Sequence, residues 1–188
     1  LGMFQQIELN TPLTMVADHT ELLVSFGGIP MKNTQVDGGG TGKHSVKTDL
    51  LKCRKKGVRF VSFSPLKSDM ADFLEAEWQP LRPNTDTALM MGLAHELVTG
   101  GQNKPTFLES HCTGYDRFEA YLLGKTDGVP KDADWAGGIA DVAPDMIRRL
   151  AAEMATKRTM INLSWSTQRT DHGEQAFWMA ITLAAILG

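Results

Sequence analysis

The sequence predicts an α/β fold: a three-layer, Rossmann-like domain with a mostly parallel sheet and helices on both faces. Two observations favour it. Short apolar runs of strand length alternate with longer segments of helical periodicity. The links between them are short, and strand–helix–strand units with short links form right-handed crossovers between parallel strands.

Four segments are typical of strands. The first two, 21–26 and 58–63, are apolar runs that border glycine, and 76–81 and 160–163 follow later in the chain. Polar or glycine-containing loops come directly after each of them. Because ligands of open α/β sheets bind beyond the carboxyl ends of the strands, these loops are the candidate site.

Helices are expected between and after the strands, at 46–56, 87–98, 105–111, 115–123, 132–138, 144–156 and 176–187. The first should turn Val46, Leu50, Leu51 and Cys53 to the core. Pro144 stands at a typical first helical position. Residues 1–20 show no clear period and are expected to form a connecting segment, so the domain is predicted to span 21–188.

Composition excludes several classes of protein. The 188 residues carry a net charge of −3, which gives no electrostatic footprint for nucleic acid. No apolar run approaches membrane-spanning length. Cys53 and Cys112 stand apart and outside any Cys-x-x-Cys pair, so they are expected to be buried thiols, not ligands of zinc or iron–sulfur centres.

Three familiar site types fail on spacing. The glycine-rich stretch 37–45 has Asp37 and His44 where a P-loop needs glycine and a hydroxyl, so a flexible loop is expected there. No acid follows the second strand near Ser64, which disfavours classical NAD binding. The group His111, Cys112 and Asp116 lacks metal-ligand spacing, and no Gly-x-Ser-x-Gly elbow is present. His95 is expected to be a core histidine with its hydrogen bonds satisfied.

Each of the first three polar loops has two readings. Gly27 and Gly28 suit either a tight turn or a close approach to phosphate, with Lys32 supplying charge. Ser64 and Lys67 could meet a nucleotide, or the segment could be a turn in which Asp69 caps a short helix through Leu74.

Thr85 or Asp86 could simply cap the following helix. Alternatively, the Asp86 carboxylate could accept two hydrogen bonds from a guanine edge.

The richest loop is 164–175, between the last strand and the last helix. It gathers Trp165, Ser166, Gln168, Arg169 and His172 within a few positions. Hydrogen-bond donors with an arginine and a large aromatic suit a polyanionic ligand. The alternative is a solvated surface loop whose Trp165 fills the core.

The motifs of this loop resemble those of the molybdopterin oxidoreductases of the dimethyl sulfoxide reductase type, which include biotin sulfoxide and trimethylamine N-oxide reductases. Trp-Ser-x-Gln-Arg at 165–169 precedes His-Gly-Glu-Gln at 172–175. The stretch 82–90 resembles the family's Pro-x-Thr-Asp-x-Ala-Leu-Met. Residues 112–116, 127–131 and the pair Trp135-Ala136 follow in the family's order, so the resemblance covers about 20–188.

The resemblance implies an enzyme that reduces S-oxides or N-oxides by oxygen-atom transfer, with a molybdenum held by two molybdopterin guanine dinucleotides. It implies no catalytic or metal-ligating residue in this chain. It implies cofactor contacts as follows: Gly28, Met31 and Lys32 at a phosphate or the pterin; Ser64 and Pro65 at a nucleotide; Asn84, Thr85 and Asp86 at a guanosine; and Trp165, Ser166, Gln168, Arg169 and His172 at the pterin or diphosphate.

The resemblance also implies that two parts of the family's enzymes lie outside this chain. The serine that ligates molybdenum in this group would lie before Leu1, and the domain that completes the second dinucleotide site would lie after Gly188. The chain is therefore expected to be one cofactor-binding domain of a larger enzyme, inactive alone, with the missing domains as its partners and an electron donor that the motifs do not specify. Gly27-Gly28-Ile29 replaces a more polar stretch of relatives. The alternative is a non-catalytic α/β module that binds a nucleotide or a partner protein.

Overall fold

The computed structural model describes residues 11–34 and 44–188. At its centre is a parallel four-stranded sheet in the order β3-β2-β1-β4. The strands are β1 (Leu22–Phe26), β2 (Arg59–Ser64), β3 (Glu77–Pro80) and β4 (Thr159–Leu163). The register aligns Phe26 with Phe63 and with Leu163, so the carboxyl ends of three strands meet at one edge. The four predicted strands are confirmed.

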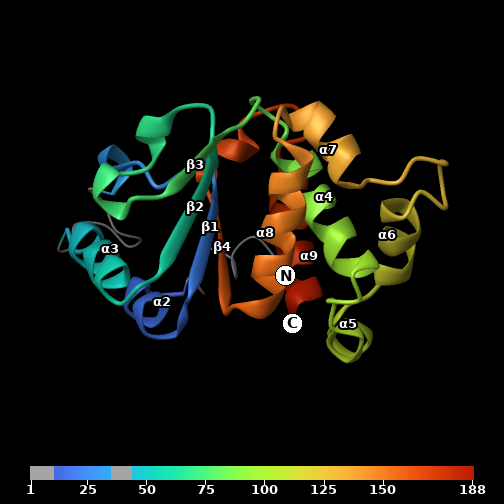
Figure 1. Cartoon of the computed structure of the whole chain (residues 1–188), viewed down its shortest axis with the longest axis horizontal. Coiled ribbons are helices and arrows are strands. Elements are labelled where there is room, and N and C mark those ends of the chain that lie inside the picture. The colour runs from blue at the N-terminus through green and yellow to red at the C-terminus, as the bar shows by residue number, and fades with distance from the viewer. Residues whose placement is uncertain (1–10, 35–43) are drawn as a thin grey trace.

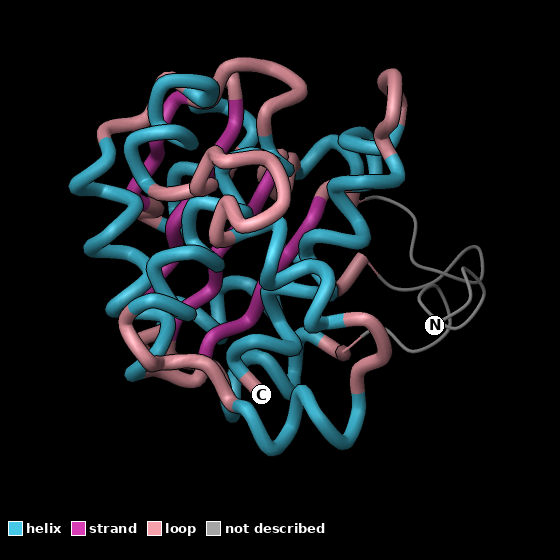
Figure 2. Tube along the Cα trace, turned by 90° about the vertical axis from the view of Figure 1, so that its right-hand side faces the viewer, coloured by secondary structure: helices cyan, strands magenta, loops and turns pink. Residues whose placement is uncertain are grey.

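Helices cover both faces of the sheet (Figure 1). On one face lie α2 (Leu13–His19) and α3 (Val46–Lys55). On the other lie α4 (Asp86–Thr99), α8 (Pro144–Thr156) and α9 (Glu174–Leu187). Figure 2 views the molecule from this second side, with the strands behind the helices. The three-layer fold predicted from the sequence is confirmed.

Three shorter helices complete the second side: α5 (Pro105–His111), α6 (Tyr115–Leu122) and α7 (Ala133–Ala140). Asp132 caps α7 by accepting a hydrogen bond from the Trp135 backbone N–H at 2.8 Å. None of the helices in the described ranges is both long enough and apolar enough to cross a bilayer.

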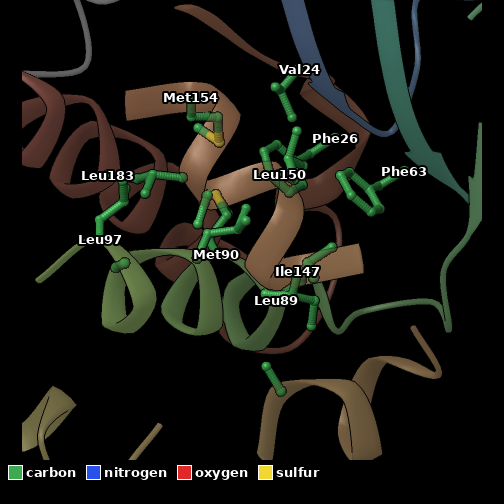
Figure 3. Close-up of a cluster of buried hydrophobic side chains, with 14 of the residues drawn as sticks. Val24, Phe26, Phe63, Leu89, Met90, Leu97, Ile147, Leu150, Met154 and Leu183 are labelled. Carbon is green, nitrogen blue, oxygen red and sulfur yellow. The ribbon is translucent and has the colours of Figure 1, made fainter. Parts of the chain in front are cut away.

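The strand residues alternate between two cores, as the two-residue period of a strand requires. Val24, Phe26 and Phe63 point to the larger core, where they meet Met90 and Leu150 of the helices (Figure 3). Leu23 and Phe60 point to the smaller core under α3. Burial of apolar side chains on both faces explains why β1 and β2 read as continuous apolar runs.

Some local features differ from the expectations. Within the stretch 1–20, expected to be a connecting segment, lies α2, whose Val16 and Ala17 are buried against the smaller core. Leu51, expected in the core, is 43% exposed. His95 leaves its Nδ1 without a hydrogen-bond partner among the described residues, so it is not a satisfied core histidine.

The two cysteines differ in burial. Cys53 is buried, whereas Cys112, expected to be buried, is only half-buried. Among the described residues, no cluster of His, Cys, Asp and Glu has the arrangement of a metal site. The glycine-rich stretch 37–45 lies almost wholly outside the described residues.

A buried lysine fixes the loop between α6 and α7. The Lys131 side chain is 2% exposed, and its Nζ lies 2.7 Å from Asp127 Oδ2 and donates to the Val129 carbonyl. It also lies 4.2 Å from the centre of the Tyr121 ring, where the face of the ring attracts a cation. The stretch 127–131 therefore has a structural role.

Candidate functional site

The loops that follow the four strands converge on one pocket at the carboxyl edge of the sheet. Its volume is about 240 Å³. It is lined by Gly27, Pro65, Asp69, Leu81, Pro83, Asn84, Asp86, Ser166 and Thr167. We refer to it as the strand-end pocket.

Two glycines after β1 allow the first two loops to touch. Gly27 and Gly28 have φ of 85° and 75°, a region that favours glycine. A Cβ on Gly28 would lie 2.3 Å from the Asp69 carbonyl oxygen, and one on Gly27 would lie 2.6 Å from Ser164 Cβ. The glycines are therefore required by close packing of the loops, whatever the pocket binds.

The loop after β2 is fixed by Ser64. Its buried hydroxyl donates to the Leu66 carbonyl at 2.8 Å, and its own carbonyl accepts from Trp78 Nε1 at 3.1 Å. Pro65 then lines the pocket. Two short 3-10 helices, Lys67–Asp69 and Asp72–Leu74, follow in place of the helix that Asp69 was expected to cap.

The start of α4 supplies the only charged group that is buried in this pocket within the described part of the chain. Asp86 is 8% exposed, and burial raises the pKa of its carboxyl above the ordinary value. Neither Asp86 nor Thr85 caps the helix by its side chain, so the capping expectation is wrong. The Thr85 hydroxyl instead donates to the Arg82 carbonyl at 2.6 Å. Asn84 has φ of 66°, a conformation that asparagine tolerates.

The loop after β4 forms the 3-10 helix η4 (Trp165–Gln168). The hydroxyls of Ser164 and Ser166 lie 2.9 Å apart, and Thr167 Oγ1 donates to the Ser164 carbonyl at 2.8 Å. Trp165 is 47% exposed and meets Phe177 edge-on at 6.0 Å between ring centres. The interpretation of Trp165 as a core residue is therefore wrong.

The structure brings some of the predicted residues together and leaves others outside the pocket. Pro65, Asn84, Asp86 and Ser166 line it. Among the remaining predicted residues, Gly28 and Ser64 are buried next to it in the chain; Met31, Thr85 and Gln168 are half-buried; and Lys32, Trp165, Arg169 and His172 are exposed.

Sequence reasoning gave no binding role to four pocket residues: Asp69, Leu81, Pro83 and Thr167. Thr167 stands between two residues that were singled out, in a loop already chosen for its polarity. Its place within that loop was the available signal. Leu81 gave no signal, because it ends a strand and resembles any core residue.

A larger pocket, of about 400 Å³, lies at α5 and α6 and contains none of the predicted residues. Glu109, Asp116 and Glu119 line it around Tyr115. Burial, together with the charge of Glu119, raises the pKa of Tyr115 to about 12. This pocket lies away from the carboxyl ends of the strands, where ligands of open α/β sheets bind. The smaller strand-end pocket, which the loops after all four strands line, is therefore the better candidate.

Comparison with models of protein families shows which family the chain belongs to. The family model described as "Molybdopterin oxidoreductase" matches residues 4–188. The chain belongs to the molybdopterin oxidoreductase family. The resemblance in the motifs at 82–90 and 165–175 is thereby confirmed.

Curated members of the family are similar along the whole chain. Biotin sulfoxide reductase of Cereibacter sphaeroides is 46% identical over 94% of this chain and 24% of its own length. Trimethylamine-N-oxide reductase of Haemophilus influenzae is 38% identical over all of this chain and 23% of its own length. The chain thus spans about a quarter of the length of these molybdopterin oxidoreductases.

The fold has a solved counterpart in acetylene hydratase from Pelobacter acetylenicus. The TM-score is 0.72 at 22% identity, over 92% of this chain and 22% of that one. At this identity the likeness concerns the fold alone. It agrees with the parallel sheet and its two helical layers.

Proposed function

We propose that this chain is a cofactor-binding domain of a molybdenum enzyme that reduces S-oxides or N-oxides, and that its strand-end pocket holds the guanine of a molybdopterin guanine dinucleotide. The observation that carries the proposal is Asp86. Its carboxylate is buried at the wall of the pocket, and its own backbone N–H is the one donor found for it among the described residues. A buried carboxylate with so few donors is costly unless a ligand supplies more.

Guanine has the donors that this carboxylate lacks. Its ring N–H and its exocyclic amino group lie side by side and suit the two oxygens of an ionised Asp86. Cytosine also donates through an amino group, but it offers no adjacent ring N–H. The flanking positions are compatible with a flat base, because Pro65 and Asn84 line the same pocket.

The remaining contacts are proposed from the resemblance of the motifs to those of the family. Ser166 offers a hydroxyl at the pocket, and the exposed Lys32 and Arg169 offer positive charge to a diphosphate. Trp165, with almost half of its surface exposed, offers a flat face to a pterin. Gln168 and His172 would add polar groups beside the pocket, and Gly28, Met31, Ser64 and Thr85 would hold the loops that form it.

When bound, the molybdenum cofactor supplies the oxygen-atom transfer chemistry. The residues of this chain bind and orient the cofactor. The names of the relatives support oxides of sulfur or nitrogen as the substrate class, because they are reductases of biotin sulfoxide, dimethyl sulfoxide and trimethylamine N-oxide. Since the chain spans about a quarter of those enzymes, we propose that it has no reductase activity alone.

The test is calorimetric titration of the chain with GMP, with IMP as a probe that lacks the exocyclic amino group. We expect GMP to bind at least about tenfold more tightly than IMP. We expect Asp86→Asn to weaken GMP binding by a similar factor. Asp134→Asn is the matched control, because Asp134 is an exposed carboxylate paired with Arg148 on the same helical side. Equal affinity of wild type and Asp86→Asn for GMP would contradict the proposal.

The alternative, a non-catalytic nucleotide- or partner-binding module, makes a different prediction for the polypeptide that carries this chain. A reductase domain predicts that the purified polypeptide contains molybdenum and releases guanine nucleotide on denaturation. A binding module predicts neither. Metal and nucleotide analysis of that polypeptide, with a sulfoxide reduction assay, separates the two.

A further inference from the structure

The edge of the sheet at β4 lacks the features that protect a free edge. Within residues 11–34 and 44–188, β4 pairs with β1 alone. All five of its residues are half-buried, and the segment Thr159–Leu163 contains neither a charge nor a proline. Unpaired edge strands in natural proteins usually carry such residues, because bare edges pair with other chains. An uncharged edge strand without proline indicates a strand that is normally paired.

The helix after β4 has a bare side as well. After Glu174 no residue of α9 is charged. One side of the helix packs on the larger core through Ala176, Met179, Leu183 and Ile186. The opposite side presents Phe177, Trp178, Ile181 and Ala184, which we name the α9 outer face; Trp178 is 67% exposed and Ile181 37%. Gln175 and Thr182 are the only polar residues of α9 after Glu174, and a helix with so few polar residues is normally covered on most sides.

The edge and the α9 outer face belong to one region. The loop between β4 and α9 is η4, whose Trp165 lies edge-on against Phe177 of this face. On the same side of the sheet, Arg149 of α8 reaches Glu77 of the opposite edge strand β3, whereas α9 contacts β4. The two bare surfaces therefore adjoin each other and the rim of the strand-end pocket.

We infer that the β4 edge and the α9 outer face form one docking surface that takes up a further segment of the same polypeptide, with a β-strand pairing in parallel with β4. Two observations select this occupant. A strand followed by a helix continues by a right-handed crossover into a neighbouring parallel strand, and β4 followed by α9 leaves that place open. The similar enzymes are about four times as long as this chain, so they contain the additional polypeptide.

The inference rests on the proposed function in one respect, since both take the chain to be part of a longer enzyme. It adds which surface the rest of the enzyme covers. Through Trp165 the docked segment would close one side of the cofactor pocket, so assembly of the enzyme and retention of the cofactor would be linked.

The experiment compares the 188-residue chain with the longer polypeptide that carries it, both at concentrations where each is monomeric. Hydrogen exchange is measured on peptides that cover β4 and β3, and oxidation by N-bromosuccinimide is measured at Trp178 and Trp135. In the longer polypeptide we expect β4 amides and Trp178 to react at least about tenfold more slowly than in the short chain. The peptide of β3 and the partly buried Trp135 are internal controls and should react alike in both.

Matched substitutions link the two halves of the surface. In the longer polypeptide, Trp178→Gln with Ile181→Gln should restore fast exchange at β4, whereas Ala152→Gln, at an exposed position of α8, should not. Equal reactivity of β4 and Trp178 in the two lengths would overturn the inference. So would protection that disappears on dilution, which would identify a second copy as the occupant, or a reading frame confined to these residues. Molybdenum and guanine nucleotide retained without protection of β4 would overturn the docking surface and leave the proposed function intact.

Discussion

The two edges of the sheet differ in how they meet solvent. The β3 edge carries Glu77 at its start and Pro80 at its end. Glu77 pairs with Arg59 of β2 and lies 2.5 Å from Arg149 of α8, and Arg59 reaches Glu153 at 2.7 Å. The β4 edge has no charge at all. One edge is built to end a sheet, and the other resembles an interior strand that lacks its neighbour.

The covering helices repeat the contrast. In α8, Asp145 and Arg148 are exposed on the side away from the core, and Arg149 and Glu153 pair with charges of the sheet. In α9 the outer side carries no charge after Glu174 and exposes Trp178 and Ile181. Since the two helices have 13 and 14 residues and lie in one layer, the difference is not one of length. The charges of α8 fit a helix that faces solvent, whereas the uncharged side of α9 fits the docking surface proposed above.

The largest effect is expected from Arg59, which joins the charges of the β3 edge. Arg59→Met leaves the half-buried Glu77 and Glu153 with fewer partners, and we expect the free energy of unfolding to fall by about 2 kcal/mol. Arg158→Met, next to β4, is the control: its side chain is 70% exposed, and we expect a loss below about 1 kcal/mol. Urea denaturation of both variants measures the free energy of unfolding. Equal losses in the two variants would contradict a special stabilising role of the charges at the β3 edge.

The protonation of Glu77 provides a second test of how the charges stabilise the β3 edge. Burial opposes its ionisation, but the hydrogen bond from Arg149 and the positive charges of Arg149 and Arg59 outweigh burial, so the pKa of Glu77 lies below its ordinary value. A lowered pKa stabilises the fold above the unfolded pKa of about 4.3, and this stability is lost as pH falls through the folded pKa.

We therefore expect wild type to lose about 1 kcal/mol more than Glu77→Gln as pH falls from 6 to 3. Urea denaturation at a series of pH values measures this. If Glu77→Gln loses stability as steeply as wild type, the β3 charges do not stabilise that edge.

A second carboxylate, Asp86, lies just beyond the other end of β3 and behaves in the opposite way. Because burial raises its pKa, its ionisation destabilises the fold; the penalty is absent below the unfolded pKa of about 3.9, grows as pH rises above that value, and is complete above the folded pKa. Asp86→Asn should therefore stabilise the ligand-free chain at pH 7 by up to about 1 kcal/mol, although it weakens the binding of GMP. Thermal unfolding at pH 7 and pH 4 tests this, since the gain should shrink at the lower pH. A variant less stable than wild type at pH 7 would show that Asp86 has a structural role.

The sequence predicted the fold well where local patterns decide the structure. The apolar runs at β1 and β2 are unambiguous because both faces of these strands are buried. The bounds of α8 coincide with the predicted 144–156, since Pro144 begins the helix and its apolar period is regular. The convergence of the polar loops on one edge followed from parallel strands alone.

Features decided by distant packing were not predictable in this way. Asp86 resembles a helix cap in sequence, yet it is buried in a pocket that is also lined by Gly27, Pro65 and Ser166 from three other loops. Lys131 resembles a surface lysine, but Tyr121 and Asp127 enclose it. Val16 and Ala17 form too short an apolar pair to reveal α2 before α3 is placed against them. The cofactor contacts assigned to the loops stay predictions until ligand binding is measured.

The smallest effect on stability is expected from substitution of Trp178. The same substitution tests the α9 outer face directly. Its exposed ring should contribute less than about 0.5 kcal/mol to unfolding of the isolated chain, since surface positions rarely contribute more. Large exposed apolar patches promote association, so the wild-type chain should self-associate as its concentration rises. Trp178→Gln should remain closer to the monomer mass of 20.6 kDa, and Ala152→Gln should behave as wild type. Light scattering over a concentration series measures this. A wild-type chain that stays monomeric throughout would show that the β4 edge and the α9 outer face need no cover, and the two edges would then differ in sequence but not in behaviour.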